Sequence, residues 1–327
     1  MLKVALIGCG FMGCMHAGCY KNIKNVELAA VADVRYEKAA AAAEGTSAKI
    51  FADGKDLIAE GGFDIIDICL PTHLHAEYAM LAMEKAPYVF VEKPVALTAE
   101  EADAMIKKAA ETGARVQVGQ VMRFWDEYTV LTGIIKSGKY GKIINANFRR
   151  ISPVPTWGWD GWLLDANRSG GAAQDLHIHD VDYVLSVLGE PKRYCSAKNK
   201  IGERNAYIAS LFTYDDCVVS LEGTWDLPGS YPFTAGFRVV FEKATVEYAA
   251  GKLFLYDENG VSEIAIEKKA VEGEGYEGGN ISDLGPYFNE ILYFCDRCAA
   301  GEEIGIATLA EGTASLKFVL KEIAADA

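Results

Sequence analysis

Residues 2–13 read Leu-Lys-Val-Ala-Leu-Ile-Gly-Cys-Gly-Phe-Met-Gly, an apolar run that leads directly into the pattern G-x-G-x-x-G. Gly8 permits a tight turn off a strand, Gly10 lets a pyrophosphate approach the backbone, and Gly13 lets the following helix pack on the sheet. The start of that helix attracts phosphate through its N–H groups and its partial positive charge. The stretch therefore predicts a dinucleotide site, with an ordinary strand–turn–helix as the alternative. The residues of the predicted binding turn are Gly8, Gly10, Phe11, Met12 and Gly13.

An acidic residue at a suitable distance follows the glycine turn. Asp33 lies near the end of a second apolar run, residues 26–34, and twenty positions after Gly13. A carboxylate at this distance binds both ribose hydroxyls of NAD and repels the 2′-phosphate of NADP. Arg35 would weaken that selection, because a guanidinium attracts phosphate. We expect NAD as the cofactor, with NADP as the alternative.

Size and composition limit the classes of function. The chain has 327 residues, 50% of them hydrophobic, and a formal net charge of −14. This length is enough for two domains with a large core. The negative charge argues against a nucleic-acid partner, since phosphate contacts need basic side chains. No apolar run approaches the length of a membrane span and the first strand leaves no room for a signal peptide, so we expect a cytoplasmic protein without a membrane partner.

Cysteine usage agrees with that compartment. The chain has eight cysteines, most of them inside apolar runs. Only Cys295 and Cys298 have C-x-x-C spacing, and neither a second pair nor a nearby histidine completes a metal site there. We therefore expect eight reduced thiols and no bound metal.

Two patterns divide the chain near residue 120. Residues 1–120 alternate short β-rich runs with helical patterns, which predicts a doubly wound parallel sheet covered by helices on both faces. Residues 121–327 include the stretch 193–269, in which strand-like runs are separated by turn signals. This second part predicts an α+β domain with a large, mostly antiparallel open sheet. Two helices close the chain, and we expect the last to pack back on the first domain.

Glu92, Lys93 and Pro94 follow the apolar run 88–91 at the end of a predicted parallel strand. Ligands of doubly wound sheets bind at the carboxyl ends of strands, so Lys93 would project into the ligand crevice. There a lysine can exchange a proton with a substrate hydroxyl. Pro94 fixes the local turn and is a candidate cis proline. The alternative is a surface lysine paired with Glu92.

The densest polar cluster is Asp175-Leu-His177-Ile-His179-Asp180, which follows two glycines and opens an apolar helical pattern. Asp175 and His179 are four positions apart and would share one face of a helix, whereas His177 would point elsewhere. A histidine near a carboxylate suits acid–base catalysis near neutral pH. The alternatives are a helix-capping cluster and a metal site built on His-x-His. The divergence of residues two positions apart disfavours the metal.

Further residues are candidates for ligand binding. Pro71, Thr72 and His75 lie where the apolar run 65–69 ends, and would line a nicotinamide pocket unless they only begin a helix. Arg123 and the aromatic side chains of a Trp-rich loop would hold a polar, ring-shaped ligand, with packing as the alternative for the tryptophans. The tryptophans of this loop are Trp157, Trp159 and Trp162.

Together these motifs resemble the glucose–fructose oxidoreductase/inositol dehydrogenase (Gfo/Idh/MocA) family over essentially the whole chain. The matching motifs, in chain order, are Gly8-x-Gly10-x-x-Gly13, Pro71-Thr72-x-x-His75, Glu92-Lys93-Pro94 and Gly170-Gly171…Asp175-x-x-x-His179-Asp180. The resemblance implies an NAD(P)-dependent oxidoreductase that acts on CH–OH groups of sugars, inositols or related polyols. It also implies an N-terminal Rossmann domain, and a homodimer or homotetramer formed through the C-terminal sheet.

The resemblance implies roles for single residues as well. Lys93 resembles the catalytic lysine that holds the reacting hydroxyl, Asp175 a catalytic carboxylate that orients substrate, and His179 the acid–base group that takes the hydroxyl proton. Many members have glycine at position 177, so the histidine of this chain leaves the particular sugar open. Cofactor contacts are implied for the glycine turn, Asp33, Arg35, Pro71, Thr72, His75, Glu92 and Lys93, and substrate contacts for Arg123, Trp157, Trp162 and His177.

Three functions stay open from the sequence. A dehydrogenase would oxidise a secondary alcohol, or reduce the ketone, with net turnover of the cofactor. A glycoside-cleaving enzyme would use the same redox step internally and regenerate its NAD. A sensor would bind the dinucleotide without turnover, but it would have no need for acid–base side chains. We favour the dehydrogenase.

Overall fold

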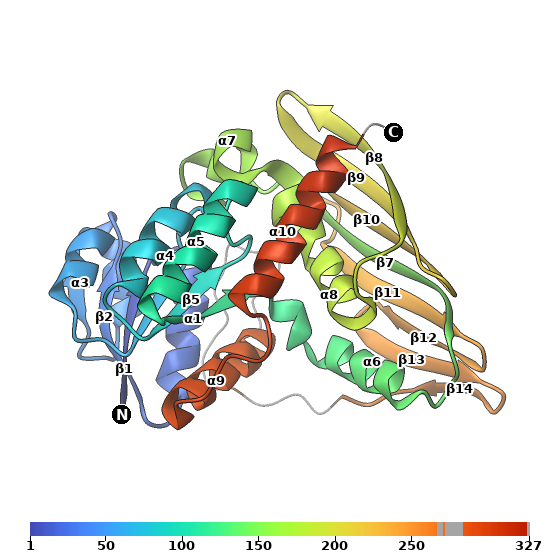
Figure 1. The fold of residues 1–327 in the computed structure, drawn as a ribbon, viewed down its shortest axis with the longest axis horizontal. Helices are drawn as coiled ribbons and strands as arrows, with labels where there is room; N and C mark the ends of the chain where they lie inside the picture. The colour runs from blue at the N-terminus through green and yellow to red at the C-terminus, as the bar shows by residue number, and fades with distance from the viewer. Residues whose placement is uncertain (267–270, 272–283, 326–327) are drawn as a thin grey trace. The chain divides into compact units, whose positions relative to one another are not determined.

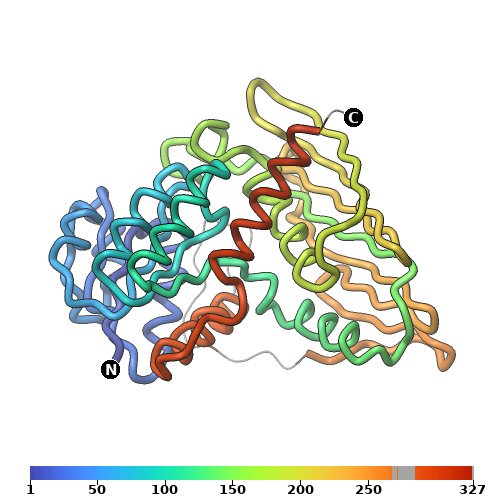
Figure 2. The backbone as a smooth tube through the Cα atoms, viewed as in Figure 1, coloured from blue at the N-terminus to red at the C-terminus, as the bar shows by residue number. Residues whose placement is uncertain are grey.

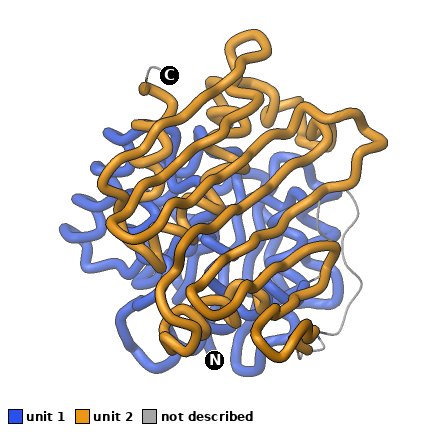
Figure 3. Tube along the Cα trace, turned by 90° about the vertical axis from the view of Figure 1, so that its right-hand side faces the viewer, with its two compact units in different colours: residues 1–124, 269–314 blue, residues 125–268, 315–327 orange. Residues whose placement is uncertain are grey.

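The computed structural model describes residues 1–266, 271 and 284–325. The chain divides into two compact units, coloured separately in Figure 3. Unit 1 comprises residues 1–124 and 269–314, and unit 2 comprises residues 125–268 and 315–327. Figure 2 shows the path of the backbone by colour, from blue at the N-terminus to red at the C-terminus. The chain passes from unit 1 to unit 2 after residue 124, contributes to unit 1 again up to residue 314, and ends in unit 2.

Unit 1 contains a six-stranded sheet in the order β3-β2-β1-β4-β5-β6 (Figure 1). Every neighbouring pair in it is parallel, which confirms the predicted doubly wound sheet. Its strands are β1 (Leu2–Ile7), β2 (Val26–Ala32), β3 (Lys49–Phe51), β4 (Ile65–Ile68), β5 (Tyr88–Glu92) and β6 (Arg115–Gly119). Its helices are α1 (Phe11–Asn22), α2 (Tyr36–Ala43), α3 (Gly54–Glu60), α4 (His75–Met83), α5 (Ala99–Thr112) and α9 (Gly285–Ala300), with the 3₁₀ turns η1 (Thr72–Leu74) and η2 (Val121–Arg123).

Helices cover both faces of this sheet, because its central strands are apolar on both sides. Val4 and Leu6 of β1 share one core cluster with buried residues of α1, α2 and α9. Ile7 faces the opposite side, toward α3 and α4: a Cβ added at Gly54 would lie 2.5 Å from its Cγ2 and 2.9 Å from Tyr78. The loops at the carboxyl edge of the sheet are therefore fixed by strands buried on two faces.

Unit 2 is built on an eight-stranded sheet in the order β14-β13-β12-β11-β7-β10-β9-β8. Its neighbours are antiparallel except for β7 and β10, which run parallel, so the predicted mostly antiparallel sheet is confirmed. Its strands are β7 (Ile143–Pro153), β8 (Arg193–Ile201), β9 (Arg204–Thr213), β10 (Val218–Leu227), β11 (Thr234–Phe241), β12 (Ala244–Ala249), β13 (Lys252–Asp257) and β14 (Gly260–Glu263). Its helices are α6 (Asp126–Ser137), α7 (Ala166–Ser169), α8 (Ile178–Leu188) and the end of α10 (Leu309–Ala324), with the turns η3 (Trp159–Leu164) and η4 (Ala173–His177).

Aromatic side chains attach the helices of unit 2 to one face of its sheet. The Tyr128 ring of α6 lies 5.0 Å from Phe237 of β11, and the Phe318 ring of α10 lies 5.0 Å from Phe212 of β9. Such edge-on aromatic pairs add to the burial of apolar area. No helix in the described part of the chain has the length and apolar character needed to cross a membrane.

Candidate functional site

The glycine turn between β1 and α1 has room for a ligand at one position only. A Cβ at Gly8, where φ is +90°, would lie 2.5 Å from the Cys69 carbonyl oxygen, and one at Gly13 would lie 1.8 Å from the Gly8 carbonyl oxygen. These two glycines let strand and helix approach each other. Gly10 has open space instead, since the atom nearest to an added Cβ is an Arg35 nitrogen at 3.9 Å. The turn therefore fits a pyrophosphate that approaches the backbone at Gly10.

Asp33 lies directly after β2 and is engaged by its neighbours. Its carboxylate accepts the backbone N–H groups of Cys9 and Arg35, both at 2.8 Å. The Arg35 guanidinium also donates to it, with Nε at 3.0 Å and Nη2 at 3.1 Å. The two residues expected to choose between NAD and NADP thus form one ion pair beside the glycine turn.

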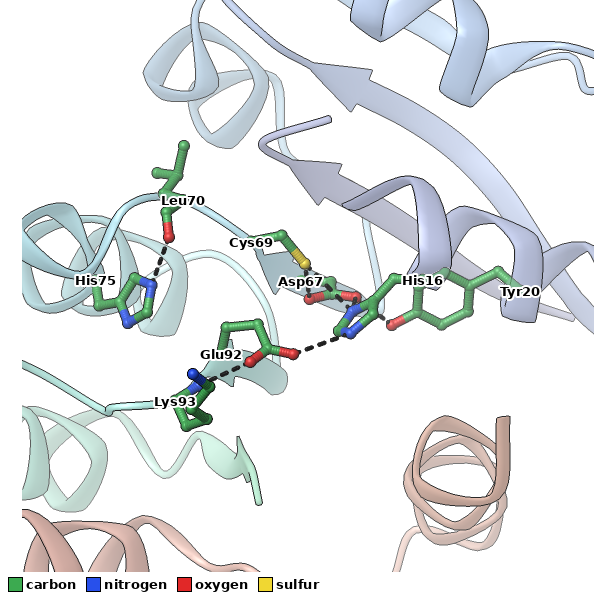
Figure 4. A network of polar contacts seen from close by, with 8 residues as sticks. All are labelled: His16, Tyr20, Asp67, Cys69, Leu70, His75, Glu92 and Lys93. Carbon is green, nitrogen blue, oxygen red and sulfur yellow. Dashed lines mark hydrogen bonds and ion pairs between the residues drawn. The ribbon is translucent and has the colours of Figure 1, made fainter. Parts of the chain in front are cut away.

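Lys93 follows the carboxyl end of β5, and the Lys93–Pro94 peptide bond is cis, as the sequence suggested. The Lys93 backbone N–H donates to Glu92 Oε2 at 3.0 Å (Figure 4). Burial alone would raise the pKa of Glu92, but the neighbouring charges of His16 and Lys93 outweigh it and lower that pKa. Glu92 is therefore a buried, ionised carboxylate that holds the backbone of the lysine turn.

His75 joins the lysine turn to the loop after β4. Its Nδ1 lies 2.7 Å from the Pro94 carbonyl oxygen, and its Nε2 lies 2.7 Å from the Leu70 carbonyl oxygen. Burial lowers the pKa of His75, and a neutral imidazole carries one N–H, which can serve only one of these carbonyls at a time. Thr72 is buried too, whereas Pro71 is partly exposed. These positions support a bracing role for His75, and its direct contact with nicotinamide stays a prediction.

Arg123 ends the turn η2, which follows β6 in unit 1. Its Nη1 lies 2.7 Å from Glu311 Oε1 of α10, and its side chain is 7% exposed. Burial would raise the pKa of Glu311, but Arg123 and the bonds from Thr308 outweigh burial and lower it. The ion pair fixes the guanidinium at the start of α10, and the expected contact of Arg123 with substrate stays a prediction.

The polar cluster of unit 2 differs from the predicted continuous helix. Its first part, Ala173–His177, is a π-type turn that leads into α8, so the α-helical spacing expected for Asp175 and His179 does not hold there. The cause is the wider winding of a π turn, which often occurs at functional sites. Between Gly171 and Asp180, only Asp175 and His179 are partly exposed. Within this segment, the two partly exposed residues are the two that were predicted to act on a substrate.

A buried ion pair anchors the start of α8 to the sheet of unit 2. The Arg150 guanidinium of β7 donates to both oxygens of Asp180, at 2.9 and 3.1 Å, and both side chains are 2% exposed. Tyr128 bonds to both partners, at 3.1 and 3.2 Å. Because Asp180 follows His179 directly, this pair fixes the backbone that carries the predicted acid–base residue.

The remaining predicted substrate residues have different surroundings. His177 is fully buried, with Nε2 3.4 Å from Glu322 Oε1 and its Cβ close to Gly223, which supports a packing role instead of the expected substrate contact. Trp162 packs on a small apolar cluster around Leu163 and Trp225, in agreement with the packing alternative. Trp157 is 42% exposed and stays a candidate for ligand contact.

Sequence reasoning missed two residues beneath the lysine turn. His16 lies on α1 and Asp67 in β4, and both are fully buried and 2.8 Å apart through Nδ1 and Oδ2. A signal for them exists in the sequence, because Asp67 is the single charged residue in the strand Ile65–Ile68. A charge in a strand that is buried on both faces needs a partner.

Comparisons with known protein families agree with this geometry. Residues 2–120 match the model of the oxidoreductase family with an NAD-binding Rossmann fold, and residues 128–247 match the GFO/IDH/MocA C-terminal domain. The chain belongs to the GFO/IDH/MocA oxidoreductase family, and its N-terminal part is the NAD-binding Rossmann domain of that family.

Curated relatives include sugar and inositol dehydrogenases. D-glucoside 3-dehydrogenase of Escherichia coli (strain K12) is 30% identical over 192 residues, which are 58% of this chain and 55% of that protein. Myo-inositol 2-dehydrogenase of Thermotoga maritima is 28% identical over 193 residues, again 58% of this chain and 55% of the relative. The match thus spans little more than half the length of these relatives.

Solved structures share the whole fold. Levoglucosan dehydrogenase, solved with NADH and levoglucosan, has a TM-score of 0.84 at 20% identity and covers 99% of this chain and 97% of its own. An oxidoreductase from Agrobacterium radiobacter, solved with NAD⁺, L-tartaric acid and magnesium, has a TM-score of 0.84 at 19% identity and covers 99% and 96%. These likenesses confirm the predicted two-part architecture.

Proposed function

We propose that this protein is an NAD-dependent dehydrogenase of a secondary alcohol in a sugar, an inositol or a related polyol. The observation that carries the proposal is the selective exposure of Asp175 and His179 within a segment whose other residues from Gly171 to Asp180 are buried. A histidine and an aspartate that are partly exposed among buried neighbours are available for acid–base chemistry on a bound ligand. The names of the glucoside and inositol dehydrogenases among its relatives support the same class of substrate.

Each proposed role follows from the chemistry of the side chain. NAD, when bound, supplies the acceptor for hydride. His179 takes the hydroxyl proton, Asp175 orients the substrate and the imidazole, and Lys93 holds the reacting oxygen through its ammonium. Glu92 and His75 hold the lysine turn by the contacts given above, and Arg150 with Asp180 holds the start of α8.

We propose NAD as the working cofactor, with NADP bound more weakly. Asp33 directly follows β2, where a carboxylate can accept two ribose hydroxyls. Its pairing with Arg35 lessens its negative charge, which reduces the repulsion of a 2′-phosphate without removing it. Binding titrations with NADH and NADPH test this, and much tighter binding of NADPH would contradict it.

The test of the activity is a screen of NAD⁺ and NADP⁺ reduction over inositols, sugars, sugar acids and amino sugars. We expect net formation of NADH with at least one cyclic polyol or sugar. Product without net NADH would support an internal redox cycle instead. Ligand-induced thermal shifts without any turnover would support a sensor.

We also propose a cytoplasmic homo-oligomer in which the open face of the unit 2 sheet contacts a second copy. Leu211 and Val218 are 42% and 38% exposed on neighbouring strands, while the adjacent Phe212 and Val219 are buried. Alternation of this kind puts apolar side chains on the face opposite to the helices. Light scattering of the purified chain tests the state, and a monomer at micromolar concentration would contradict it.

A further inference from the structure

His16 is a fully buried histidine that lies between two carboxylates. Its Nδ1 is 2.8 Å from Asp67 Oδ2, and its Nε2 is 3.1 Å from Glu92 Oε1 (Figure 4). The first contact is a hydrogen bond, while the second is an ion pair by distance without good alignment. None of the catalytic roles proposed above uses this histidine.

The two carboxylates decide the protonation state of the ring. A neutral imidazole has one N–H and one lone pair, so it would turn a lone pair toward one of the two acids. Only the imidazolium offers an N–H to both. Burial alone would lower the pKa of His16, but the charge of Asp67, with hydrogen bonds to Asp67 and Cys69, outweighs burial and raises that pKa well above the usual range.

The other groups around the ring fit a fixed positive charge. Tyr20 donates its hydroxyl to Asp67 Oδ2 at 2.8 Å, which further fixes that carboxylate. Cys69 Sγ lies 3.3 Å from Nδ1 and 3.5 Å from Asp67 Oδ1, and burial raises the pKa of this thiol, so it stays protonated. The Phe90 ring closes the site edge-on, with its centroid 5.3 Å from that of the imidazole.

Glu92 connects His16 to the lysine turn through its two carboxylate oxygens. One oxygen of Glu92 faces His16, and the other accepts the Lys93 backbone N–H at 3.0 Å. Gly119 of the neighbouring β6 makes room for this carboxylate, since a Cβ there would lie 2.9–3.0 Å from its atoms. The carboxylate therefore lies between His16 of α1 and the Lys93 backbone, in space that the missing side chain of Gly119 leaves open.

We propose that His16 is a positioning residue: a permanently charged imidazolium that ties the dinucleotide-binding helix α1 to the turn that carries Lys93. Asp67 neutralises the positive charge of His16. Glu92 connects His16 to the backbone N–H of Lys93. The importance of this link for turnover rests on the proposed function, because it depends on the role of Lys93. The protonation state of His16 and the connection from His16 through Glu92 to Lys93 do not depend on the proposed function.

His75 provides an internal control for the charge. It is as buried as His16, but its two nitrogens face carbonyl oxygens, which are uncharged, and burial lowers its pKa. Two buried histidines of the same sheet edge should therefore differ in protonation at the same pH.

The first test is ¹⁵N NMR of the ring nitrogens in the intact wild-type chain without ligand, from pH 6 to 9. We expect both nitrogens of His16 to keep the imidazolium signature over this range, while His75 shows the neutral form. One unprotonated His16 nitrogen at pH 7 would overturn the proposal. So would a stoichiometric metal ion in the purified protein, because the polar atoms of His16, Asp67 and Cys69 lie within 4.8 Å of one another and a metal would displace the Nδ1 proton.

The second test measures the link to Lys93. In His16→Gln, we expect exchange of the Lys93 amide proton to accelerate about tenfold or more, because Glu92 loses its charged partner. The matched control Tyr20→Phe removes another hydrogen bond to Asp67 but keeps the imidazolium, and should leave this amide nearly unchanged. Equal acceleration in both variants would overturn the positioning role.

A kinetic measurement separates this proposal from the proposed function. If the wild type reduces NAD⁺ with a polyol, His16→Gln should lower kcat while cofactor affinity is retained. The control Tyr20→Phe should leave kcat nearly unchanged. If no polyol or sugar is turned over, the proposed function fails while both NMR tests still decide the state of His16. If His16→Gln does not fold, the wild-type spectrum decides.

Discussion

At the scale of single residues, ion pairs hold the carboxylates at the carboxyl edge of the unit 1 sheet, where the cofactor is proposed to bind. Asp33 is held by Arg35 and Cys9, and Glu92 is held by His16 and the Lys93 backbone. Around Glu92, the neighbouring charges of His16 and Lys93 outweigh burial and lower the pKa of the carboxyl group. We therefore expect substitutions at these positions to change cofactor choice or the pH dependence of stability while the fold is kept.

Asp33 and Arg35 should shift cofactor choice in opposite directions. We expect Asp33→Ala to weaken NADH binding by about tenfold or more and to narrow the gap to NADPH, since it loses the ribose acceptor and releases the guanidinium. Arg35→Ala should widen the preference for NADH over NADPH, because the negative charge of Asp33 then has no guanidinium beside it to offset the repulsion of a 2′-phosphate. Fluorescence titration of both cofactors measures this. The assignment fails if Asp33→Ala retains wild-type NADH affinity.

The imidazolium of His16 should make stability depend on pH above neutrality. Its folded pKa is raised, so its contribution is fully present below the unfolded value of about 6.5 and is lost as the pH rises through the folded value. Between pH 7 and 8 the wild type should lose up to about 1.4 kcal/mol more than His16→Gln/Glu92→Gln, which keeps amide donors without the ion pair. Urea unfolding at both pH values measures this difference. Parallel pH dependence of the two proteins would contradict it.

At the scale of elements, the turn from β1 to α1 separates two tasks of glycine. Gly8 and Gly13 let strand and helix pack at distances that no Cβ allows, while Gly10 has free space and a φ of −71°. The first two are needed for the fold, and the third is needed for the ligand.

Two alanine substitutions should separate these tasks. Gly13→Ala should destabilise the chain by about 1–3 kcal/mol or more, because its Cβ would overlap the Gly8 carbonyl. Gly10→Ala should change stability by less than about 0.5 kcal/mol but weaken NAD binding, because a methyl group occupies the approach of the pyrophosphate. Thermal unfolding with and without NAD compares the two. Unchanged NAD binding in Gly10→Ala would place the phosphate elsewhere.

The elements themselves were largely predictable from the sequence, whereas their polar connections were not. Apolar runs and turn signals indicate both sheets, because burial of a strand leaves a local pattern. The charge of Asp67 within a buried strand indicates that it needs a partner, but no local pattern identifies His16, which lies 51 positions away, as that partner. The π-type turn at Ala173–His177 was also missed, since its sequence reads as ordinary helix and tertiary packing sets the winding.

At the scale of the whole molecule, each unit supplies part of the proposed chemistry. Unit 1 carries the NAD-binding fold, with Lys93 held by Glu92 and His75. Unit 2 carries Asp175 and His179 on a segment anchored by Arg150 and Asp180. The family and both sheets were predicted from motifs spread along the chain, but the substrate depends on surfaces that no short motif encodes.

The most direct test of the account is steady-state NADH formation with the best substrate of the screen, in wild type, Lys93→Ala and His179→Ala. We expect each variant to lower kcat by about a hundredfold or more, because each loses a group that acts on the reacting hydroxyl, with NAD affinity largely retained. Trp162→Phe, a change at a packed position, should keep kcat within about threefold of wild type. Turnover at the wild-type rate in either Lys93→Ala or His179→Ala, with NAD still bound, would contradict the central claim.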